Sequence, residues 1–383
     1  MHDRGSCLTR KASERRFEPS AAWSWWLVCA LVSLVVTPAA GQDAGSLIKA
    51  EVERLQQSLK EKPLSHPDFP NANAGMGDLL KSVLQAQAAG KLYVSLEQLA
   101  QAEDFVYGVW LVMDKAEAVK GGLPIFEIEW EKASASVDAL NRDARASDSS
   151  GAPVMLQALI GTALGKTLPL LEGGREFAVA TEPKDGLFNP GEAKGEAQFA
   201  AFCASLHLRR NGTPYPLRTL LPELQQLQQK TNAAFQPPRS IELQTQFMVL
   251  NSTLKLAQDF DASRFYAGAL SQYLLAVFDY GMLDTIVPGP AEQAALKNAL
   301  AAARRRLDAS LRDDSMAQFI LEHAELNLAH PDGSAPSADD WKAAKVMLDQ
   351  VLPAYYAAEK PPAMVAQAAG KTVDITLVRW PYT

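Results

Sequence analysis

The apolar pattern from residue 261 to residue 287 is that of an element around which the rest of the chain packs. Read as a helix, this stretch is apolar around most of its circumference, and its polar residues form one narrow stripe: Arg264, Ser271, Gln272 and Asp279. A helix with this pattern is buried by neighbouring helices on most sides. Its tyrosines and polar residues argue against a membrane span. The pattern therefore predicts a central helix, with Leu274 and Val277 in its most buried sector.

Helical periodicity recurs along most of the remaining chain. The stretch 92–115 contains the apolar run FVYGVWLVM, which predicts a second centre of the core, and Glu97, Gln101 and Asp104 mark its expected solvent side. Ser337 precedes two aspartates and supplies the expected N-cap of the last helix. Further helices are expected at 46–62, 76–89, 124–140, 154–171, 193–208, 217–235, 241–258, 291–308, 316–329 and 339–358. The fold class is all-α, a multi-helix array with one short C-terminal β-strand.

Three stretches carry other signals. Residues 173–195 are rich in glycine and proline, including Gly173-Gly174, and predict a long loop. Residues 373–380 alternate between two faces and are β-branched, which predicts a strand, and residues 176–181 are its best candidate partner. Gly161 and Gly165 have a small-residue spacing that lets helices approach closely.

Two short segments share the order small, small, basic, apolar, tyrosine at the start of an apolar helix. They are residues 89–93 and 262–266, and their tyrosines are separated by about half of the chain that follows the leader, which fits duplication of a helical unit. The fragment Ala-Gly-x-x-Tyr also resembles the inner part of a tetratricopeptide helix pair. The 34-residue period and the Trp and Pro positions of that family are missing. The resemblance therefore implies helical hairpins and carries over no functional residues.

The N-terminus has the pattern of an export signal. Basic residues precede the apolar run 21–36, and small residues follow, with Ala39 and Gly41 at the −3 and −1 positions of a cleavage site. Residues 1–41 are therefore expected to be a signal peptide, with Gln42 as the new N-terminus. The alternative is an uncleaved N-terminal anchor helix. The expected location is secreted or periplasmic.

The predicted organisation after the signal peptide has three parts. Residues 42–75 form an N-terminal helix and linker, residues 76–370 an α-helical domain that divides into two similar halves, and residues 371–383 a C-terminal strand or tail.

Composition and charge narrow the function classes. The chain is 48% hydrophobic and 21% charged, with a net charge of −7, so it is globular and an unlikely ligand for nucleic acid, which needs a basic face. Two of its three cysteines precede residue 42. Cys203 is left alone, so the exported core must be stabilised without an internal disulfide. Its apolar surroundings predict a buried structural thiol, the alternatives being a nucleophile or an intermolecular bridge.

No local motif for catalysis, metal binding or cofactor binding is present. His323 and His330 share a helix face, but a metal would need a further ligand from elsewhere, so neither a metal nor a cofactor is expected. The adjacent carboxylate pairs do not face one cleft and fit solvated helix faces and caps: Glu127/Glu129, Asp313/Asp314 and Asp339/Asp340. Catalytic residues are therefore not identified.

One set of residues is a candidate ligand-facing surface. Tyr266, Tyr273 and Tyr280 step by seven along the central helix, beginning beside Arg264. The alternative is core packing with the hydroxyls at the edge of the core. The sequence favours an exported, non-catalytic binding or scaffold protein of the cell envelope, with an unknown protein or small-molecule partner. The alternatives are an extracytoplasmic enzyme whose site converges from several helices, and an N-terminally anchored envelope protein that meets the membrane only through its uncleaved signal segment.

Overall fold

The structure, a computed structural model, describes residues 43–146, 151–330 and 333–360. Regular structure in these ranges is helical apart from one isolated bridge between Thr213 and Arg312, so the all-α class is confirmed. The predicted signal peptide, residues 1–41, and the predicted strand, residues 373–380, lie outside the described residues.

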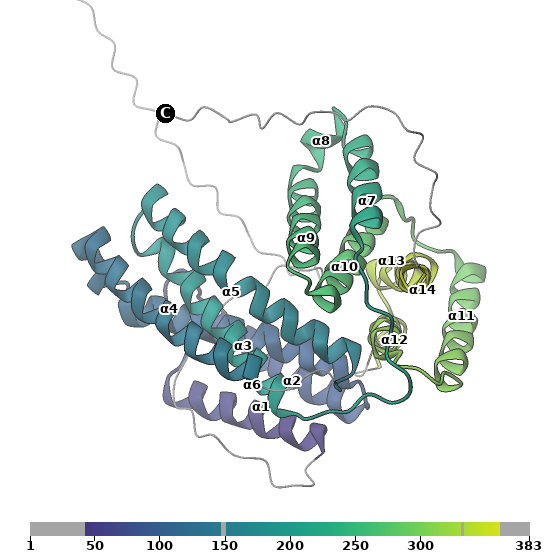
Figure 1. Cartoon of the computed structure of the whole chain (residues 1–383), viewed down its shortest axis with the longest axis horizontal. Coiled ribbons are helices and arrows are strands. Elements are labelled where there is room, and N and C mark those ends of the chain that lie inside the picture. Colours follow the sequence, from purple (N-terminus) through teal and green to yellow (C-terminus); the bar gives the residue numbers. More distant parts are fainter. Residues whose placement is uncertain (1–42, 147–150, 331–332, 361–383) are drawn as a thin grey trace, which may run out of the picture.

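The helices form two groups (Figure 1). The first six pack as a bundle, and the later helices form a second group against one side of it. From α7 to α9 the chain projects beyond the bundle at the top of the view. The elements are α1 Ala44–Glu61, α2 Ala72–Ala88, α3 Leu92–Lys115, η1 Ala118–Gly121, α4 Leu123–Ala146, α5 Val154–Ala180, η2 Asp185–Leu187, α6 Phe188–Ser205, α7 Leu221–Ala234, α8 Arg239–Glu242, α9 Gln244–Ala262, α10 Tyr266–Asp284, α11 Pro290–Asp308, α12 Ser315–Leu328, α13 Ala338–Val346, the π-helical turn η3 Met347–Val351 and α14 Leu352–Ala358.

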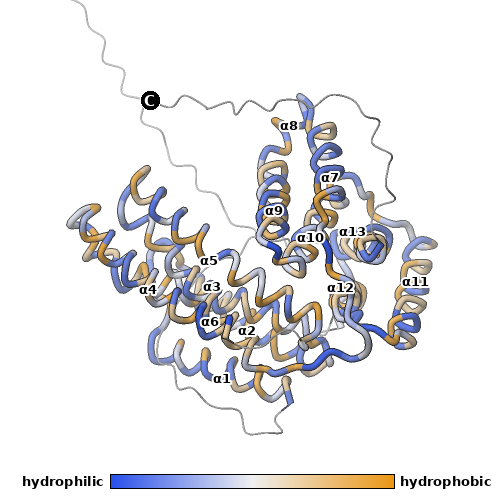
Figure 2. The backbone as a smooth tube through the Cα atoms, viewed as in Figure 1, coloured by the Kyte–Doolittle hydropathy of each residue, from blue (hydrophilic) through white to orange (hydrophobic). Residues whose placement is uncertain are grey.

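Apolar and polar stretches alternate along each helix, which is the pattern of helices that bury one face (Figure 2). One large apolar core joins the two groups and includes residues of α3, α5, α6, α10 and α12. Among the described helices, α5 has the length and hydropathy of a membrane span. Just over half of that stretch is buried inside the fold, as in a core helix.

Glycines set the closest helix contacts. A β-carbon added at Gly191 of α6 would lie 2.4 Å from Cα of Gly108 on α3, so the two backbones touch there. On α5, Gly165 faces the ring of Phe260, at 2.1 Å from such a β-carbon, and Gly161 faces the backbone of Gly268. The predicted close approach at the α5 glycines is confirmed.

The loop predicted at residues 173–195 is wrong. Helix α5 continues to Ala180, the turn η2 follows, and α6 begins at Phe188. Gly174 lies inside α5 and does not end it. A side chain at this position would clash with Pro190 and the backbone of Gly186, so the close contact requires glycine. Pro190 lies in the first turn of α6, where a missing N–H costs little. The proposed strand partner, residues 176–181, is therefore wrong too: residues up to Ala180 are helical.

The central helix is α10, which is shorter than predicted because a turn precedes Tyr266. Leu274 is buried and Val277 half-buried. The predicted polar stripe is only partly exposed to water: Arg264 is exposed, and Ser271 and Asp279 are half-buried. Gln272 is buried, and burial raises the pKa of Asp279 to about 7.

Helix α3 has its predicted bounds, but its predicted solvent side is wrong. Asp104 is buried under α6, and Glu97 and Gln101 are half-buried. Glu97 lies 2.7 Å from Nε2 of His323 on α12, so a neighbouring helix covers that face as well.

The turns that precede α3 and α10 have the same hydrogen-bond pattern. The N–H of Lys91 donates to the carbonyl of Ala86, and that of Phe265 donates to the carbonyl of Phe260, the 6→1 bond of a Schellman motif. The left-handed residues at the two turns are Gly90, φ 72°, and Arg264, φ 65°. When the two turns are superposed by their hydrogen bonds, Arg264 is equivalent to Gly90. This alignment is shifted by one residue from the one that matches Tyr93 with Tyr266.

Carboxylates distant in sequence cap several helices. Glu322 of α12 accepts the backbone N–H groups of Tyr93 and Val94 at 3.0 and 3.1 Å. Asp313 accepts the N–H of Val154 at 2.6 Å, at the start of α5. An acceptor at a helix N-terminus satisfies orphan donors and complements the helix dipole. These bonds tie the second helix group to the bundle. The last predicted cap is also confirmed, since the side chain of Ser337 accepts the N–H of Asp340.

Candidate functional site

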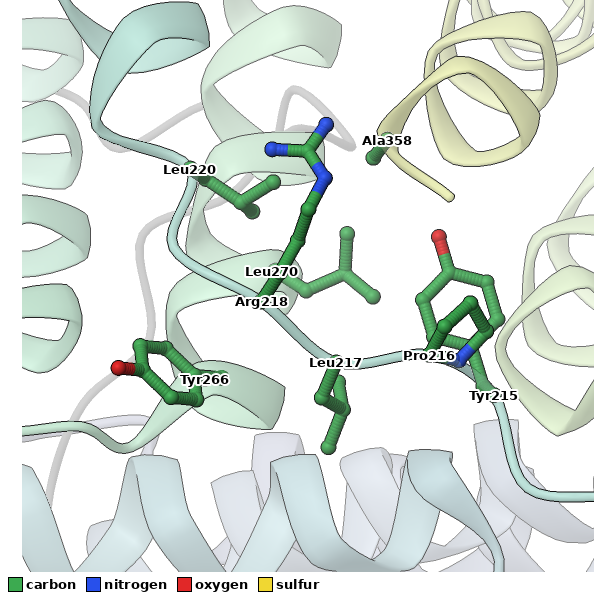
Figure 3. A pocket seen from close by; sticks show the side chains of 8 residues that line it. All are labelled: Tyr215, Pro216, Leu217, Arg218, Leu220, Tyr266, Leu270 and Ala358. Carbon is green, nitrogen blue, oxygen red and sulfur yellow. The ribbon is translucent and has the colours of Figure 1, made fainter. Parts of the chain in front are cut away.

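A shallow crevice lies where the segment before α7 passes between α10 and the end of α14 (Figure 3). Almost none of its space is wide enough for a water-sized sphere. Ligand pockets are typically about 300–1,000 Å³, so the crevice has no room for a metabolite. Its lining is mostly apolar with one arginine: Tyr215, Pro216, Leu217, Arg218, Leu220, Tyr266, Leu270 and Ala358.

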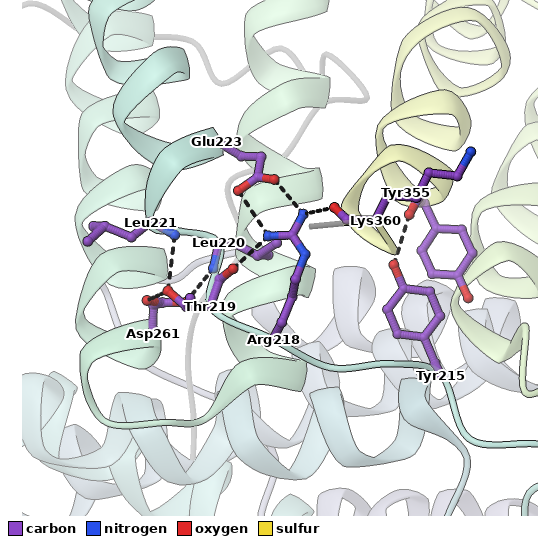
Figure 4. Close-up of polar contacts among 9 residues, drawn as sticks. All are labelled: Tyr215, Arg218, Thr219, Leu220, Leu221, Glu223, Asp261, Tyr355 and Lys360. Carbon is purple, nitrogen blue, oxygen red and sulfur yellow. Dashed lines mark hydrogen bonds and ion pairs between the residues drawn. The ribbon is translucent and has the colours of Figure 1, made fainter. Parts of the chain in front are cut away.

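The arginine of the crevice is bonded to groups of this chain (Figure 4). Arg218 forms an ion pair with both carboxylate oxygens of Glu223 and donates to the carbonyls of Thr219 and Lys360 at 2.7 and 2.6 Å. Thr219 and Glu223 are close to Arg218 in the chain, whereas Lys360 is 142 residues away. Arg218 therefore joins the start of α7 to the end of α14. Both terminal nitrogens of its guanidinium are engaged by internal acceptors, and Nε is buried without a hydrogen-bond partner.

Two further contacts hold the same junction. Asp261 at the end of α9 accepts the Thr219 hydroxyl at 2.6 Å and the Leu220 N–H at 2.7 Å. Tyr215 stacks on Tyr355, with ring centroids 4.8 Å apart, and its hydroxyl donates to the Tyr355 carbonyl at 2.9 Å. The arrangement is that of a structural joint between α7, α9 and α14.

The candidate ligand-facing residues separate in space. Tyr266 lines the crevice. Tyr273 lies near Arg218, and its pKa is raised by burial and by Glu223. Arg264 is exposed in the turn before α10, and Tyr280 is half-buried against the main core. The structure therefore places two of the four beside the Arg218 joint. Sequence reasoning missed that joint because its partners are far apart in the chain.

The histidines and the cysteine have structural environments. Burial alone would lower the pKa of His323, but Glu97 beside it outweighs burial and raises that pKa. His330 lies 3.1 Å from Asp340. In the part of the chain that the structure describes, no three His, Cys, Asp or Glu side chains are placed to hold one metal ion. Cys203 is buried, and burial raises the pKa of its thiol, so the prediction of a buried structural thiol is confirmed.

Helices α8 and α9 project beyond the bundle (Figure 1), and these helices and the segment after α10 carry exposed apolar side chains. We call these five residues the arm tip: Ile241 of α8, Met248 and Val249 of α9, and Ile286 and Val287 after α10. Ile241 is 74% exposed and Ile286 is 77% exposed.

An ion pair holds the arm tip together. Arg239 of α8 donates to Asp284 at the end of α10, at 2.6 Å, and so links the two segments that lead to Ile241 and Ile286. This pair balances the charges of Arg239 and Asp284, while Glu242, directly after Ile241, is exposed.

A second apolar region lies at the far end of the bundle. It comprises exposed side chains from the start of α4 and the end of α5: Leu123, Ile125, Ile128, Phe177 and Val179. Charged pairs interrupt this region. Arg175 bonds Glu127 at 2.9 Å and lies over the ring of Trp130.

No protein-family model matches the chain, and searches of curated proteins and of solved structures returned no significant match.

Proposed function

We propose that the protein is an exported, non-catalytic helical binding protein that docks a partner protein through the arm tip. The observation that carries this proposal is the exposure of Ile241 and Ile286 on two segments that the Arg239–Asp284 ion pair links. Monomeric proteins rarely expose contiguous apolar patches of large side chains, and such patches mark interaction sites. The partner surface that fits the arm tip is mainly apolar, because the tip offers five exposed apolar side chains, with the Arg239–Asp284 ion pair and Glu242 beside them.

The geometry of the crevice supports a binding role over catalysis. Its one cation, Arg218, is engaged by Glu223 and by backbone carbonyls. Catalytic groups must face a space that a substrate can enter. The crevice is small, and its polar groups serve the joint between α7 and α14.

A scaffold of repeated hairpins is part of the same proposal. The α2–α3 and α9–α10 pairs each join two helices through the same Schellman turn, and each leads into a long apolar helix. A duplicated, tetratricopeptide-like hairpin accounts for both pairs and leaves the second copy free to extend as the arm. A short C-terminal strand at 373–380 remains a prediction.

A double substitution at the arm tip tests the binding proposal. Ile241→Asp with Ile286→Asp is expected to abolish co-purification of the partner from extracytoplasmic extracts, because burying two carboxylates at an apolar contact is costly. Leu311→Asp is the matched control, since Leu311 is 87% exposed and lies away from the arm tip. This control is expected to retain the partner.

One outcome would contradict the proposal, and another would specify the partner. Loss of the same partner in Phe177→Asp, with the arm-tip variant unchanged, would move the binding surface to the far end of the bundle. Dissociation of a homodimer by the arm-tip variant would identify the partner as a second copy of this chain. Circular dichroism of each variant confirms that it has folded.

Export is tested by the N-terminus of the secreted protein. Mass spectrometry of the extracytoplasmic product is expected to find a chain that begins near Gln42, because Ala39 and Gly41 fit the −3 and −1 cleavage positions. A product that begins at Met1 in the membrane fraction would support the anchored alternative.

A further inference from the structure

A group of buried carboxyl groups lies where α6 packs against α3. The close approach of the two helices brings them together, because Gly191 and Gly195 of α6 contact the α3 backbone at Gly108 and Asp104. Four acidic side chains at this contact are each at most 5% exposed: Glu103 and Asp104 of α3, and Glu192 and Glu196 of α6. We call these four residues the acid seam.

Few basic groups balance the acid seam. Nζ of Lys166 on α5 lies 3.0 Å from Glu196, and Arg54 on α1 lies 3.7 Å from Glu103. Arg54 is shared with Glu51, to which it is hydrogen-bonded. With Glu51 included, five carboxyl groups therefore face two cations, Lys166 and Arg54. If all of them were ionised, the seam would carry an excess of buried negative charge, which is costly in a medium of low polarity.

The hydrogen bonding of the seam shows the same imbalance. Both carboxyl oxygens of Glu103 and Oδ1 of Asp104 are buried without a hydrogen-bond partner. Burying a charged carboxylate without hydrogen-bond donors costs more than burying a neutral carboxyl group, so this environment favours the protonated form. The remaining titratable groups that act on the seam are Tyr107 of α3 and Cys203 of α6.

Burial and the neighbouring carboxyl groups raise the pKa values of the acids in the seam. Burial, with Glu196 as the next cause, raises the pKa of Glu192 to about 8. Burial also raises the pKa values of Glu103 and Asp104 well above their usual range, and neighbouring acids add to the shift. For a carboxyl group with a raised pKa in the folded state, the folded protein binds more protons than the unfolded chain. Stability is therefore highest at low pH and is lost as pH rises from about 4.5 towards 8.

We infer that the acid seam is a proton-operated device that clamps α6 onto α3 when its carboxyl groups are protonated and loosens this contact when they release their protons to solvent. Like charges then develop on both sides of a contact that has no room to relax, because glycine backbone already touches backbone. Repulsion between the two helices is relieved only by their separation. An exported protein meets the pH of its surroundings, so such a device responds to acidification.

Hydrogen exchange across pH tests the device in the full-length protein. Between about pH 6 and pH 9, opening of α3 and α6, corrected for intrinsic exchange, is expected to rise more than tenfold, since one pKa unit corresponds to a factor of ten. Helix α9 is expected to change much less, whereas α10 does not serve as a control because the pKa of its Asp279 is raised to about 7. Glu192→Gln, which cannot ionise, is expected to flatten the pH dependence of α3 and α6.

The matched control is Glu176→Gln, the same substitution at an exposed position of α5, which is expected to follow the wild type. An equal pH slope in Glu192→Gln and the wild type would overturn the inference. Infrared absorption of protonated carboxyl groups gives an independent readout, taken as the difference between the wild type and Glu192→Gln, because Asp279 of α10 also has a raised pKa. This difference is expected at about pH 7 and lost by about pH 9, and its absence at pH 7 would also overturn the inference.

An experiment with added metal ions tests whether the seam is held together by protons or by a bound metal ion. Chelator-treated wild-type protein at about pH 9 is compared with and without millimolar Ca²⁺ or Mg²⁺. No restoration of α3 and α6 protection is expected. Restoration in the wild type and not in Glu192→Gln would show that the seam holds a metal ion, against the proton-operated device.

Discussion

Leu274→Ala is expected to lower the free energy of unfolding by about 2–5 kcal/mol, as is typical when a packed leucine leaves a cavity. Leu274 is buried in α10, which packs against α5, α9 and α13. Ser271→Ala on the same helix is the matched control. It is half-buried, and it is expected to cost far less. Denaturant unfolding of both variants beside the wild type measures the difference.

Equal or inverted losses would contradict the assignment of α10 as the central helix. A large loss in Ser271→Ala would show that the polar stripe is a buried hydrogen-bonded network, since leaving partners unpaired is costly.

Gly191→Ala is expected to destabilise the protein by at least about 1–3 kcal/mol, the usual cost of overpacking. The added methyl group would lie 2.4 Å from Cα of Gly108 and 2.5 Å from the Tyr107 carbonyl oxygen, and neither backbone atom can move aside as a side chain does. Gly77→Ala in α2 is the control, because nothing lies within 4 Å of its β-carbon position. That variant is expected to gain about 0.5–1 kcal/mol, because alanine is the better helix former.

The two alanine variants are compared by thermal unfolding. A Gly191→Ala protein as stable as the wild type would show that α3 and α6 are not in backbone contact. The acid seam would then lose its structural basis as well.

Most helices could be predicted from local sequence patterns. Residues 92–115 combine an apolar run with a glycine just before them, and α3 has those bounds. Residues 173–195 misled for the same reason, because Gly174 and Pro190 are local signals for a chain break. In the fold, the glycine serves a close contact and the proline begins a helix. A single sequence does not contain the contact that distinguishes these roles.

Which side of a helix faces water depended on elements distant in the chain. Asp104 has the spacing of a solvent-facing residue on α3, yet α6 covers it from about ninety residues away in sequence. The Arg218 joint likewise unites residues of the α7 start with Asp261 and Lys360. Pairings of this separation have no periodicity, so no pattern along the chain predicts them.

The candidate site was the least predictable part. The tyrosine spacing along α10 pointed towards the crevice through Tyr266, but it did not indicate that Arg218 was already occupied. The arm tip gave no signal either. Ile241, Met248 and Val249 belong to an ordinary amphipathic pattern, and their exposure follows only from where α9 stands relative to its neighbours.

Site-specific photocrosslinking in cells that produce the protein tests directly whether the arm tip binds a partner protein. A photoreactive amino acid is placed in turn at Ile241, Ile286 and Leu311, and crosslinked products are identified by mass spectrometry. Positions 241 and 286 are expected to give crosslinks to the same partner protein, and position 311 is expected to give none. The same product in equal yield from position 311, or no product from the two arm-tip positions, would contradict the proposal.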